Sequence, residues 1–290
     1  MENYCDIATD QEIFFSTGID EIDGIFSSQG GIVSGRIYFL TGMPGTGKTT
    51  LSIKIQSKCS IKTGLYSRES SAEAVASQAK RLEIGHKRAF ISDIDKNETL
   101  ESFLESVDKK NIQLIILDSI QEIALDYIEK GVSEESAIKI IFGIIADWIK
   151  KNNKQCSAII IGHVTKDGDY KGASYLLHKS DAHIKLVADG AKMYVTCGKN
   201  RLGGSGSAFY SFIDSPEAIK FETPVVDNIT TVLQNSIKAH LAKIKKNKKM
   251  ADAYKEISKH EKALFEDDGI SSLDYLLELI RVIHRICPEA

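Results

Sequence analysis

The chain has 290 residues, of which 42% are hydrophobic and 27% are charged, and its formal net charge is −3. This composition is typical of a globular protein with one large domain, or one domain and an appendage, and it excludes a polycation that binds nucleic acid over its whole surface. Because the N-terminus lacks a signal-peptide pattern and no apolar run could span a bilayer, we expect a cytoplasmic protein without a membrane partner.

Apolar runs alternate with amphipathic segments along the first part of the chain. The runs predict strands at 36–41, 64–70, 87–94, 113–120 and 157–164, and the amphipathic segments predict helices at 49–59, 71–82, 97–111 and 133–153. Ser133 is a suitable N-cap for the last of these helices. Because most of the strands are continuous apolar runs, we expect an α/β fold with a mostly parallel sheet flanked by helices.

The pattern then changes twice. From about residue 181, strand-like segments at 183–189, 192–200 and 206–214 follow closely on one another and suggest antiparallel additions at one edge of the sheet. From about residue 228, the patterns are helical without strands. We therefore predict an N-terminal leader at 1–13, a core domain at 14–227 and a small C-terminal helical region at 228–290.

A phosphate-loop pattern, G-x-x-x-x-G-K-[ST], lies between the first expected strand and the helix after it. Its glycines let backbone N–H groups approach phosphate oxygens, and the helix N-terminus adds its positive dipole. Lys48 can reach the β and γ phosphates, and the Thr49 hydroxyl can bind Mg²⁺. The nucleotide-binding residues predicted here are Gly42, Met43, Pro44, Gly45, Thr46, Gly47, Lys48, Thr49 and Thr50.

Acidic residues follow two other expected strands. Asp118 ends the apolar run LIILD, where a carboxylate can hold Mg²⁺ in the Walker B role. Hydrolysis also requires a positioned water, and Glu69, at the end of the strand after the phosphate-loop helix, is our candidate for orienting it. Asp93 and Asp95 are alternatives that could equally be turn residues. The predicted ligands are therefore ATP and Mg²⁺.

Several segments, taken in order and spacing, resemble the RadA (Sms) branch of the RecA-like ATPases. Besides the phosphate loop they are FSTGIDEIDGIF, LYSRESS, LIILDSIQ, GHVTK, KGASYLLHKSD and GKNRLGG, and they run from about Phe15 to Asp214. The resemblance implies a RecA-like core that hydrolyses ATP held between subunits of a homo-oligomeric ring or filament, such as a hexamer. The chain lacks the four-cysteine zinc module and the C-terminal protease-like domain that normally accompany this core.

The resemblance also implies roles for individual residues. Glu69 matches the first acid of the family's S-G-E-E-S segment and would be the catalytic carboxylate, although Arg68 replaces the glycine here. His163, at the tip of the strand after Walker B, would sense the γ phosphate, whereas a lone histidine is more often a structural residue.

Lys199 and Arg201 belong to the KNR motif. Residues two apart on an extended segment face the same side, so the two cations can reach one phosphate group together. The resemblance implies that they act, with Lys48, as catalytic cations, and that they serve the ATP of a neighbouring subunit. Without the resemblance the motif would be read as a solvated turn before Gly203.

Two expected loops differ in their suitability for nucleic acid. The loop at 164–175 carries glycines together with Lys166, Tyr170 and Lys171, which suit contact with a single-stranded backbone, and RecA-like proteins place a DNA-binding loop here. A second loop, expected around 121–133, has three acids and one lysine and is a poor phosphate binder.

Two functions remain open. The first is a RecA/RadA-like ATP-hydrolysing motor that binds single-stranded DNA and acts in recombination, repair or replication. The second is a KaiC-like regulatory ATPase whose nucleotide state controls assembly with protein partners without DNA, which the acidic loop and the missing zinc module favour. In either case the C-terminal helical region could bind a protein partner, and its lysine-rich stretch at 238–249 is either a solvated helix face or a nucleic-acid contact.

Overall fold

The computed structural model describes residues 12–81, 88–92, 98–152, 155–163, 174–189, 192–212 and 219–222, and single residues at 237, 255, 257, 279, 281 and 282. The chain divides into two compact units, Met1–Glu222 and Thr223–Ala290. The N-terminal leader at 1–13 and the domain boundary at 227/228 stay predictions.

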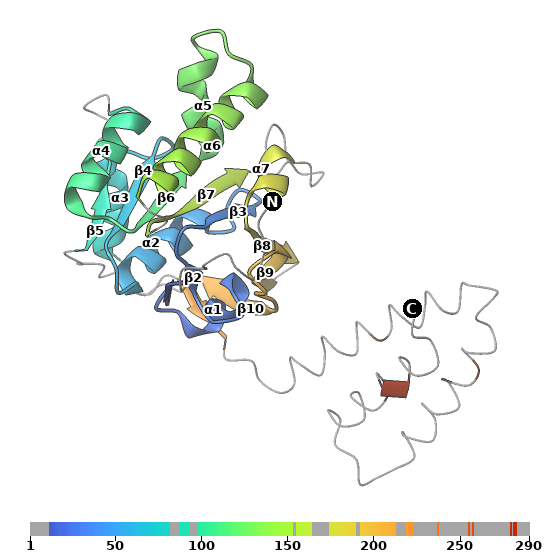
Figure 1. The fold of residues 1–290 in the computed structure, drawn as a ribbon. Coiled ribbons are helices and arrows are strands. Elements are labelled where there is room, and N and C mark those ends of the chain that lie inside the picture. Colours follow the sequence, from blue (N-terminus) through green and yellow to red (C-terminus); the bar gives the residue numbers. More distant parts are fainter. Residues whose placement is uncertain are drawn as a thin grey trace, which may run out of the picture. The chain divides into compact units, whose positions relative to one another are not determined.

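A sheet of nine described strands forms the centre of the first unit, in the order β11-β10-β9-β8-β3-β7-β6-β4-β5 (Figure 1). The strands are β3 (Ile37–Gly42), β4 (Thr63–Ser67), β5 (Ala89–Ile91), β6 (Leu114–Asp118), β7 (Ser157–His163), β8 (Ala182–Asp189), β9 (Lys192–Asn200), β10 (Ser207–Phe212) and β11 (Ile219–Phe221). Two further short strands, β1 (Phe14–Phe15) and β2 (Ile32–Val33), pair only with each other among the described residues.

Strand directions confirm the predicted fold class and correct one detail. Strands β8, β3, β7, β6, β4 and β5 all run parallel, whereas β9, β10 and β11 are antiparallel to their neighbours. The prediction that the segment at 183–189 is an antiparallel addition was wrong, because β8 pairs in parallel with β3. A connection that includes a short helix, α7 (Ser174–Lys179), separates β7 from β8, and such a crossover returns the chain in the parallel direction.

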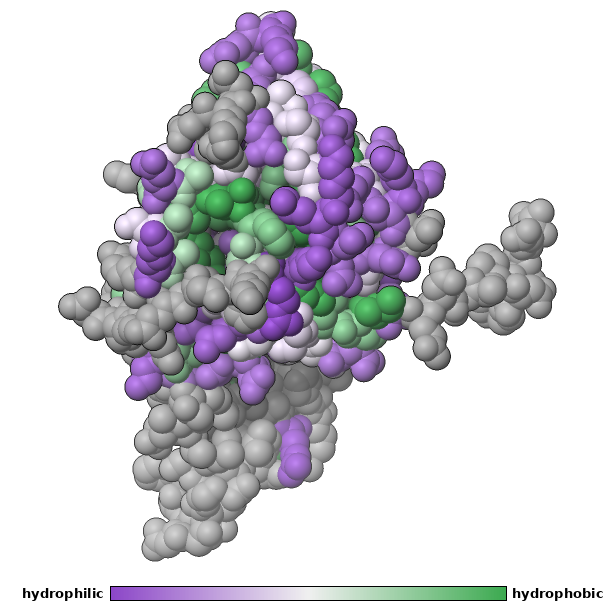
Figure 2. All heavy atoms as spheres, turned by 90° about the vertical axis from the view of Figure 1, so that its left-hand side faces the viewer, coloured by the Kyte–Doolittle hydropathy of each residue, from purple (hydrophilic) through white to green (hydrophobic). Residues whose placement is uncertain are grey.

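Helices cover both faces of this sheet. They are α1 (Asp20–Phe26), α2 (Lys48–Lys58), α3 (Ala72–Arg81), α4 (Leu100–Lys110), α5 (Ile120–Ile128), α6 (Glu134–Lys151) and α7. Alternate residues of β3 enter two separate cores: Tyr38 and Leu40 pack with α1 and α2, while Ile37 and Phe39 pack with α4, α5 and α6. Figure 2 views the molecule from the left-hand side of Figure 1. On this face most coloured side chains are hydrophilic, and hydrophobic side chains surround a hollow.

The N-termini of α4 and α6 are capped by side chains. The Thr99 hydroxyl accepts a hydrogen bond from the Ser102 N–H, and the Ser133 hydroxyl accepts one from the Ser136 N–H. Ser133 is therefore the N-cap that the sequence predicted. Each such cap stabilises its helix by about 1 kcal/mol.

The segment at 121–133 is not a loop, and that prediction was wrong. Its first part forms α5, which packs against α6 and extends with it beyond the sheet (Figure 1). Ile120, Ile123 and Ala124 have helical spacing and are fully buried. Their burial outweighs the acidic side chains that suggested a solvated loop.

A histidine lies buried between the central strands. His183 Nε2 is 2.8 Å from Thr41 Oγ1, and its ring stacks on Phe39. Burial lowers the pKa of His183 to about 4, and the positive charges of Lys185 and Lys199 contribute in the same direction. His183 is therefore neutral in the folded protein at physiological pH.

The second unit has six described residues, all of them helical. Ile237, Ile257, Leu279 and Val282 are buried, whereas Lys255 and Arg281 are exposed. Within the described parts of both units, no helix has the length and apolar character that crossing a membrane requires.

The His183 environment predicts a pH-dependent stability. Because the folded pKa lies below the unfolded value, His183 adds a penalty that is absent above pH 6.5 and grows as pH falls toward 4. Between neutral pH and pH 4, the wild-type protein should lose about 3 kcal/mol more unfolding free energy than His183→Gln. Trp148, the chain's single tryptophan, reports unfolding of the first unit by fluorescence. The exposed His178→Gln is the control, and parallel pH curves for wild type and His183→Gln would contradict the prediction.

Candidate nucleotide site

The phosphate loop joins β3 to α2. Gly47 is the N-cap of α2 and has φ 81°, a left-handed conformation that glycine adopts without strain. Gly42 ends β3, and a Cβ there would lie 2.6 Å from Thr46 Oγ1 and 2.8 Å from the Leu186 carbonyl oxygen. The loop is closed on itself, because the Thr46 hydroxyl donates to the Met43 carbonyl at 2.8 Å. Pro44 and Gly45 form its exposed tip, and Thr50 in the first turn of α2 accepts a hydrogen bond from Gln78.

Lys48 is folded back over this loop. Its Nζ donates to the carbonyl oxygens of Gly42 and Met43 at 2.9 and 3.2 Å, and the residue is 5% exposed. Burial lowers the pKa of Lys48, while the negative charges of Glu69 and Asp118 oppose that shift. The ammonium group therefore lies where phosphate oxygens could replace its carbonyl partners.

Asp118 ends β6 beside the start of α2. Its Oδ2 accepts a hydrogen bond of 2.6 Å from the Thr49 hydroxyl, whereas Oδ1 is buried without a partner among the described residues. Burial raises the pKa of Asp118, and the hydrogen bond from Thr49 opposes that shift. Hydroxyl and carboxylate oxygens are the ligands that Mg²⁺ prefers, and the orphaned Oδ1 gives the site an unused one. The residues present therefore fit a bound Mg²⁺.

Glu69 and His163 lie on either side of Asp118, because β4 and β7 are neighbours of β6. Glu69 Oε2 is 3.3 Å from His163 Nε2, and both side chains are partly exposed. The backbone N–H of His163 donates to Gln121 Oε1 at 3.2 Å. The ring atom Nδ1 of His163 is buried without a partner among the described atoms. The structure thus gathers Lys48, Thr49, Asp118, Glu69 and His163 at one edge of the sheet.

Arg68 connects this edge to α5. The Arg68 guanidinium forms an ion pair with Asp126, and the backbone N–H of Arg68 donates to the backbone carbonyl oxygen of Asp118 at 2.8 Å. The loop that carries Glu69 is therefore fixed on both sides.

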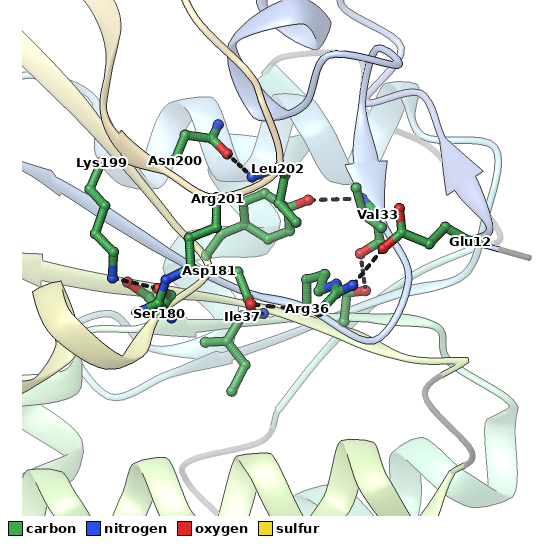
Figure 3. A network of polar contacts seen from close by, with 12 residues as sticks. Glu12, Val33, Arg36, Ile37, Ser180, Asp181, Lys199, Asn200, Arg201 and Leu202 are labelled. Carbon is green, nitrogen blue, oxygen red and sulfur yellow. Dashed lines mark hydrogen bonds and ion pairs between the residues drawn. The ribbon is translucent and has the colours of Figure 1, made fainter. Parts of the chain in front are cut away.

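Lys199 and Arg201 lie at the opposite edge of the sheet, where the parallel strands β3 and β8 begin. Because β9 is antiparallel to β8, its last residue Asn200 pairs with Ala182, while Leu186 at the other end of β8 pairs with Gly42. Lys199 Nζ donates to the carbonyl oxygens of Leu177, His178 and Ser180 at 3.0, 2.8 and 3.2 Å. Figure 3 shows Lys199 beside Ser180. Arg201 Nη2 also donates to the His178 carbonyl, at 3.2 Å. Within one chain, these cations do not meet the phosphate loop.

A cavity of about 430 Å³ adjoins Arg201 at this edge. Arg36 lines it and forms ion pairs with Glu12 at 2.5 Å and Asp181 at 3.8 Å, as Figure 3 shows. Asp181 Oδ2 in turn accepts a hydrogen bond from the Ile37 N–H. The surface around Arg201 therefore carries charges of both signs.

Two strands that the sequence did not associate with the nucleotide contact the phosphate loop and the helix that follows it. The buried Tyr210 hydroxyl on β10 donates to the Thr46 carbonyl oxygen at 2.6 Å. Lys54 on α2 donates to the Ile219 carbonyl oxygen on β11. No sequence motif marks these two contacts. Gln121, which accepts a hydrogen bond from the backbone N–H of His163, lies within the DSIQ segment and could have been predicted from that segment to be part of the site.

Some predicted residues lie outside the described part of the chain. These are Lys166, Tyr170 and Lys171 of the expected DNA-binding loop, and the alternative acids Asp93 and Asp95.

Asp118 predicts a conflict between stability and activity. Since burial penalises its charge, Asp118→Asn should raise the melting temperature of the nucleotide-free protein. The same change should lower ATP turnover on the order of 100-fold or more, because a charged Mg²⁺ ligand is lost. Thermal unfolding and phosphate release measure the two effects. A variant with a lower melting temperature would contradict the assigned cost of burying this carboxylate, and Asp147→Asn on α6 is the control.

Comparisons with known proteins agree with this geometry. A family model described as ATPase: KaiC matches residues 15–89. The chain is 30% identical over 195 residues to the DNA repair protein RadA of Aquifex aeolicus, covering 66% of this chain and 42% of the relative. It is 32% identical over 197 residues to the DNA repair protein RadA of Campylobacter jejuni, again covering 66% and 42%. The chain therefore spans about two fifths of the length of these curated relatives.

A solved structure supports the fold. The crystal structure of a KaiC-like protein from Pyrococcus horikoshii OT3 has a TM-score of 0.57 and 19% sequence identity, and the match covers 73% of this chain and 100% of that one. At this identity the likeness concerns the fold alone. The curated relatives, together with the motif residues gathered at the strand ends, make this chain similar to part of the RadA proteins, and the solved structure agrees with a RecA-like fold.

Proposed function

We propose that this protein binds and hydrolyses Mg²⁺-ATP at a seam between two copies of the chain, and that hydrolysis drives work on single-stranded DNA in recombination, repair or replication. One observation carries the part of the proposal that concerns the seam between two copies. The phosphate loop, Asp118 and Glu69 lie at one edge of the sheet, and Lys199 and Arg201 at the other. Only a second copy can bring the two sets together, so the active form is a homo-oligomer, a ring or a filament.

Nucleotide binding would use groups that already converge at the strand ends. Lys48 would exchange its contacts with two backbone carbonyls for phosphate oxygens. Thr49 and Asp118 would hold Mg²⁺, which neutralises phosphate charge. Because both side chains are already in contact, little reorganisation would be needed on binding.

Glu69 is the group that would orient the attacking water. Its carboxylate is exposed at the edge of the site and is held by His163 at 3.3 Å. A γ phosphate next to His163 would compete for this contact, so His163 would report the presence of ATP to Glu69. Carboxylate positioning of a water is the usual way to assist attack on phosphorus.

Lys199 and Arg201 would serve the ATP of the neighbouring copy. To reach it they must leave the carbonyl groups at the C-terminus of α7, which accept hydrogen bonds from both. Cations that approach the transferred phosphate stabilise the charge of the transition state. Hydrolysis would then depend on assembly.

The DNA role rests on the relatives and on sequence position. Two relatives quoted above are named DNA repair protein RadA. In the sequence, the segment with Lys166, Tyr170 and Lys171 lies between His163 at the end of β7 and Ser174 at the start of α7. Lysines that contact phosphates and an aromatic ring that stacks on a base suit single strands. A loop in this position would connect DNA to the γ-phosphate sensor on one side and to the carbonyl groups of α7 on the other.

A KaiC-like regulatory ATPase is the second candidate. The match of residues 15–89 to the model described as ATPase: KaiC favours it. In that function ATP would control assembly with a protein partner, for which the C-terminal helical region is available, and DNA would have no effect on turnover.

The two functions differ in their response to DNA. We expect ATP turnover to rise several-fold with single-stranded DNA, and the molecular mass in solution to increase when ATP is added. Replacing Lys166 and Lys171 with alanine should remove the stimulation but leave the basal rate, since these lysines would contact only DNA. An ATPase rate that is unaffected by DNA, together with ATP-dependent assembly, would favour the regulatory function instead.

Arg201→Ala tests the role of the second copy. We expect turnover to fall by at least about 100-fold, because transition-state charge is left uncompensated. ATP affinity should stay within about twofold, since Arg201 would contact the nucleotide only during the reaction. Lys220→Ala, which removes an exposed cation from β11, is the control. Full turnover by Arg201→Ala would disprove the role.

A further inference from the structure

An exposed aromatic ring lies against the phosphate loop. In β10, Ala208 and Tyr210 are buried on the core face of the strand, and Phe212 is two residues further along on the same face. Phe212 is nevertheless 44% exposed, because the core ends where β10 reaches the edge that carries the phosphate loop. The exposed part of the Phe212 ring is not used in core packing.

The ring touches the first turn of α2. A Cβ on Gly47 would lie 2.7 and 2.8 Å from the Cζ and Cε1 atoms of Phe212. Gly47 therefore both adopts a left-handed conformation and leaves room for the ring. On its other side, Phe212 packs edge-to-face with Tyr210, with 6.1 Å between the centroids. The ring is thus fixed in place while part of its surface remains open to solvent.

Holding the loop does not require this ring. The Tyr210 hydroxyl already binds the Thr46 carbonyl, and Lys54 binds the β11 backbone at Ile219. Both contacts come from groups that are buried. The exposed surface of Phe212 is therefore available for a ligand that extends beyond the phosphate loop.

We propose that Phe212 stacks on the nucleobase, or packs against the ribose, of a nucleoside triphosphate whose phosphates occupy the loop. This inference rests on the proposed nucleotide site. The nucleoside is covalently attached to phosphates that would bind at the N-terminus of α2, and the Phe212 ring lies beside that N-terminus at Gly47. Stacking on an aromatic face is available to every base and is stronger for the larger purine rings. Phe212 therefore contributes affinity for the nucleoside part, with a preference for purines.

Binding of two ligands separates the nucleoside from the phosphates. Calorimetric titrations in Mg²⁺ would use ATP and inorganic tripolyphosphate, which lacks base and ribose. We expect Phe212→Ala to weaken ATP binding about tenfold, equivalent to ~1.4 kcal/mol, and to leave the affinity for tripolyphosphate within about twofold. Phe212→Tyr should retain the affinity for ATP. Ile140→Ala, which removes a similarly exposed apolar side chain from α6, should change neither.

The outcomes distinguish this inference from the function on which it rests. Unchanged ATP affinity in Phe212→Ala would overturn the stacking role, and so would an equal loss for both ligands, which would mean that the ring only supports the loop. If wild type binds neither ligand, or binds them no better than Lys48→Ala does, the proposed nucleotide site itself fails. A smaller gap between ATP and UTP affinity in Phe212→Ala than in wild type would independently support the purine preference.

Discussion

The antiparallel direction of β9 is the constraint on which the proposed function depends. It carries Lys199 and Arg201 to the edge of the sheet opposite the phosphate loop, where they bind the carbonyl groups at the end of α7. A charge that is needed at phosphate but held at the far edge cannot act within its own chain. In such an arrangement catalysis and assembly are coupled, since each copy carries a phosphate loop at one edge of its sheet and the two cations at the other.

The edge of the sheet that carries the phosphate loop combines stable packing with costly polar groups. Two cores hold β3 and its neighbours rigidly, so the strand ends have fixed positions. At those ends Asp118 is buried with one oxygen that has no partner among the described residues, and Lys48 is buried against backbone carbonyls. Both arrangements disfavour the charged forms and would be relieved by a ligand that carries phosphate and Mg²⁺. The fold therefore tolerates local instability where chemistry takes place, which is a common feature of functional sites.

The fold class could be predicted from the sequence, and the structure brings the proposed site residues together at one edge of the sheet, because both features follow from local patterns. Apolar runs indicate buried strands, and residues just after parallel strands meet at one edge, as Thr49, Asp118 and Glu69 do. Long-range pairing was not predictable in the same way. The direction of β8, the contact of Tyr210 with the phosphate loop and the position of Phe212 all depend on which strands become neighbours. The helix α5 was missed because its acidic side chains concealed an apolar face of only three buried residues.

Mixing two inactive variants tests the central claim most directly. Lys48→Ala lacks a working phosphate loop but keeps Arg201, whereas Arg201→Ala keeps the loop and lacks the cation. If ATP is hydrolysed at a seam, a mixture of the two should regain turnover, because an intact loop of one variant can meet an intact Arg201 of the other, and each variant alone should stay inactive. A mixture no more active than the sum of its separate components, although the two variants co-assemble by mass, would contradict the account.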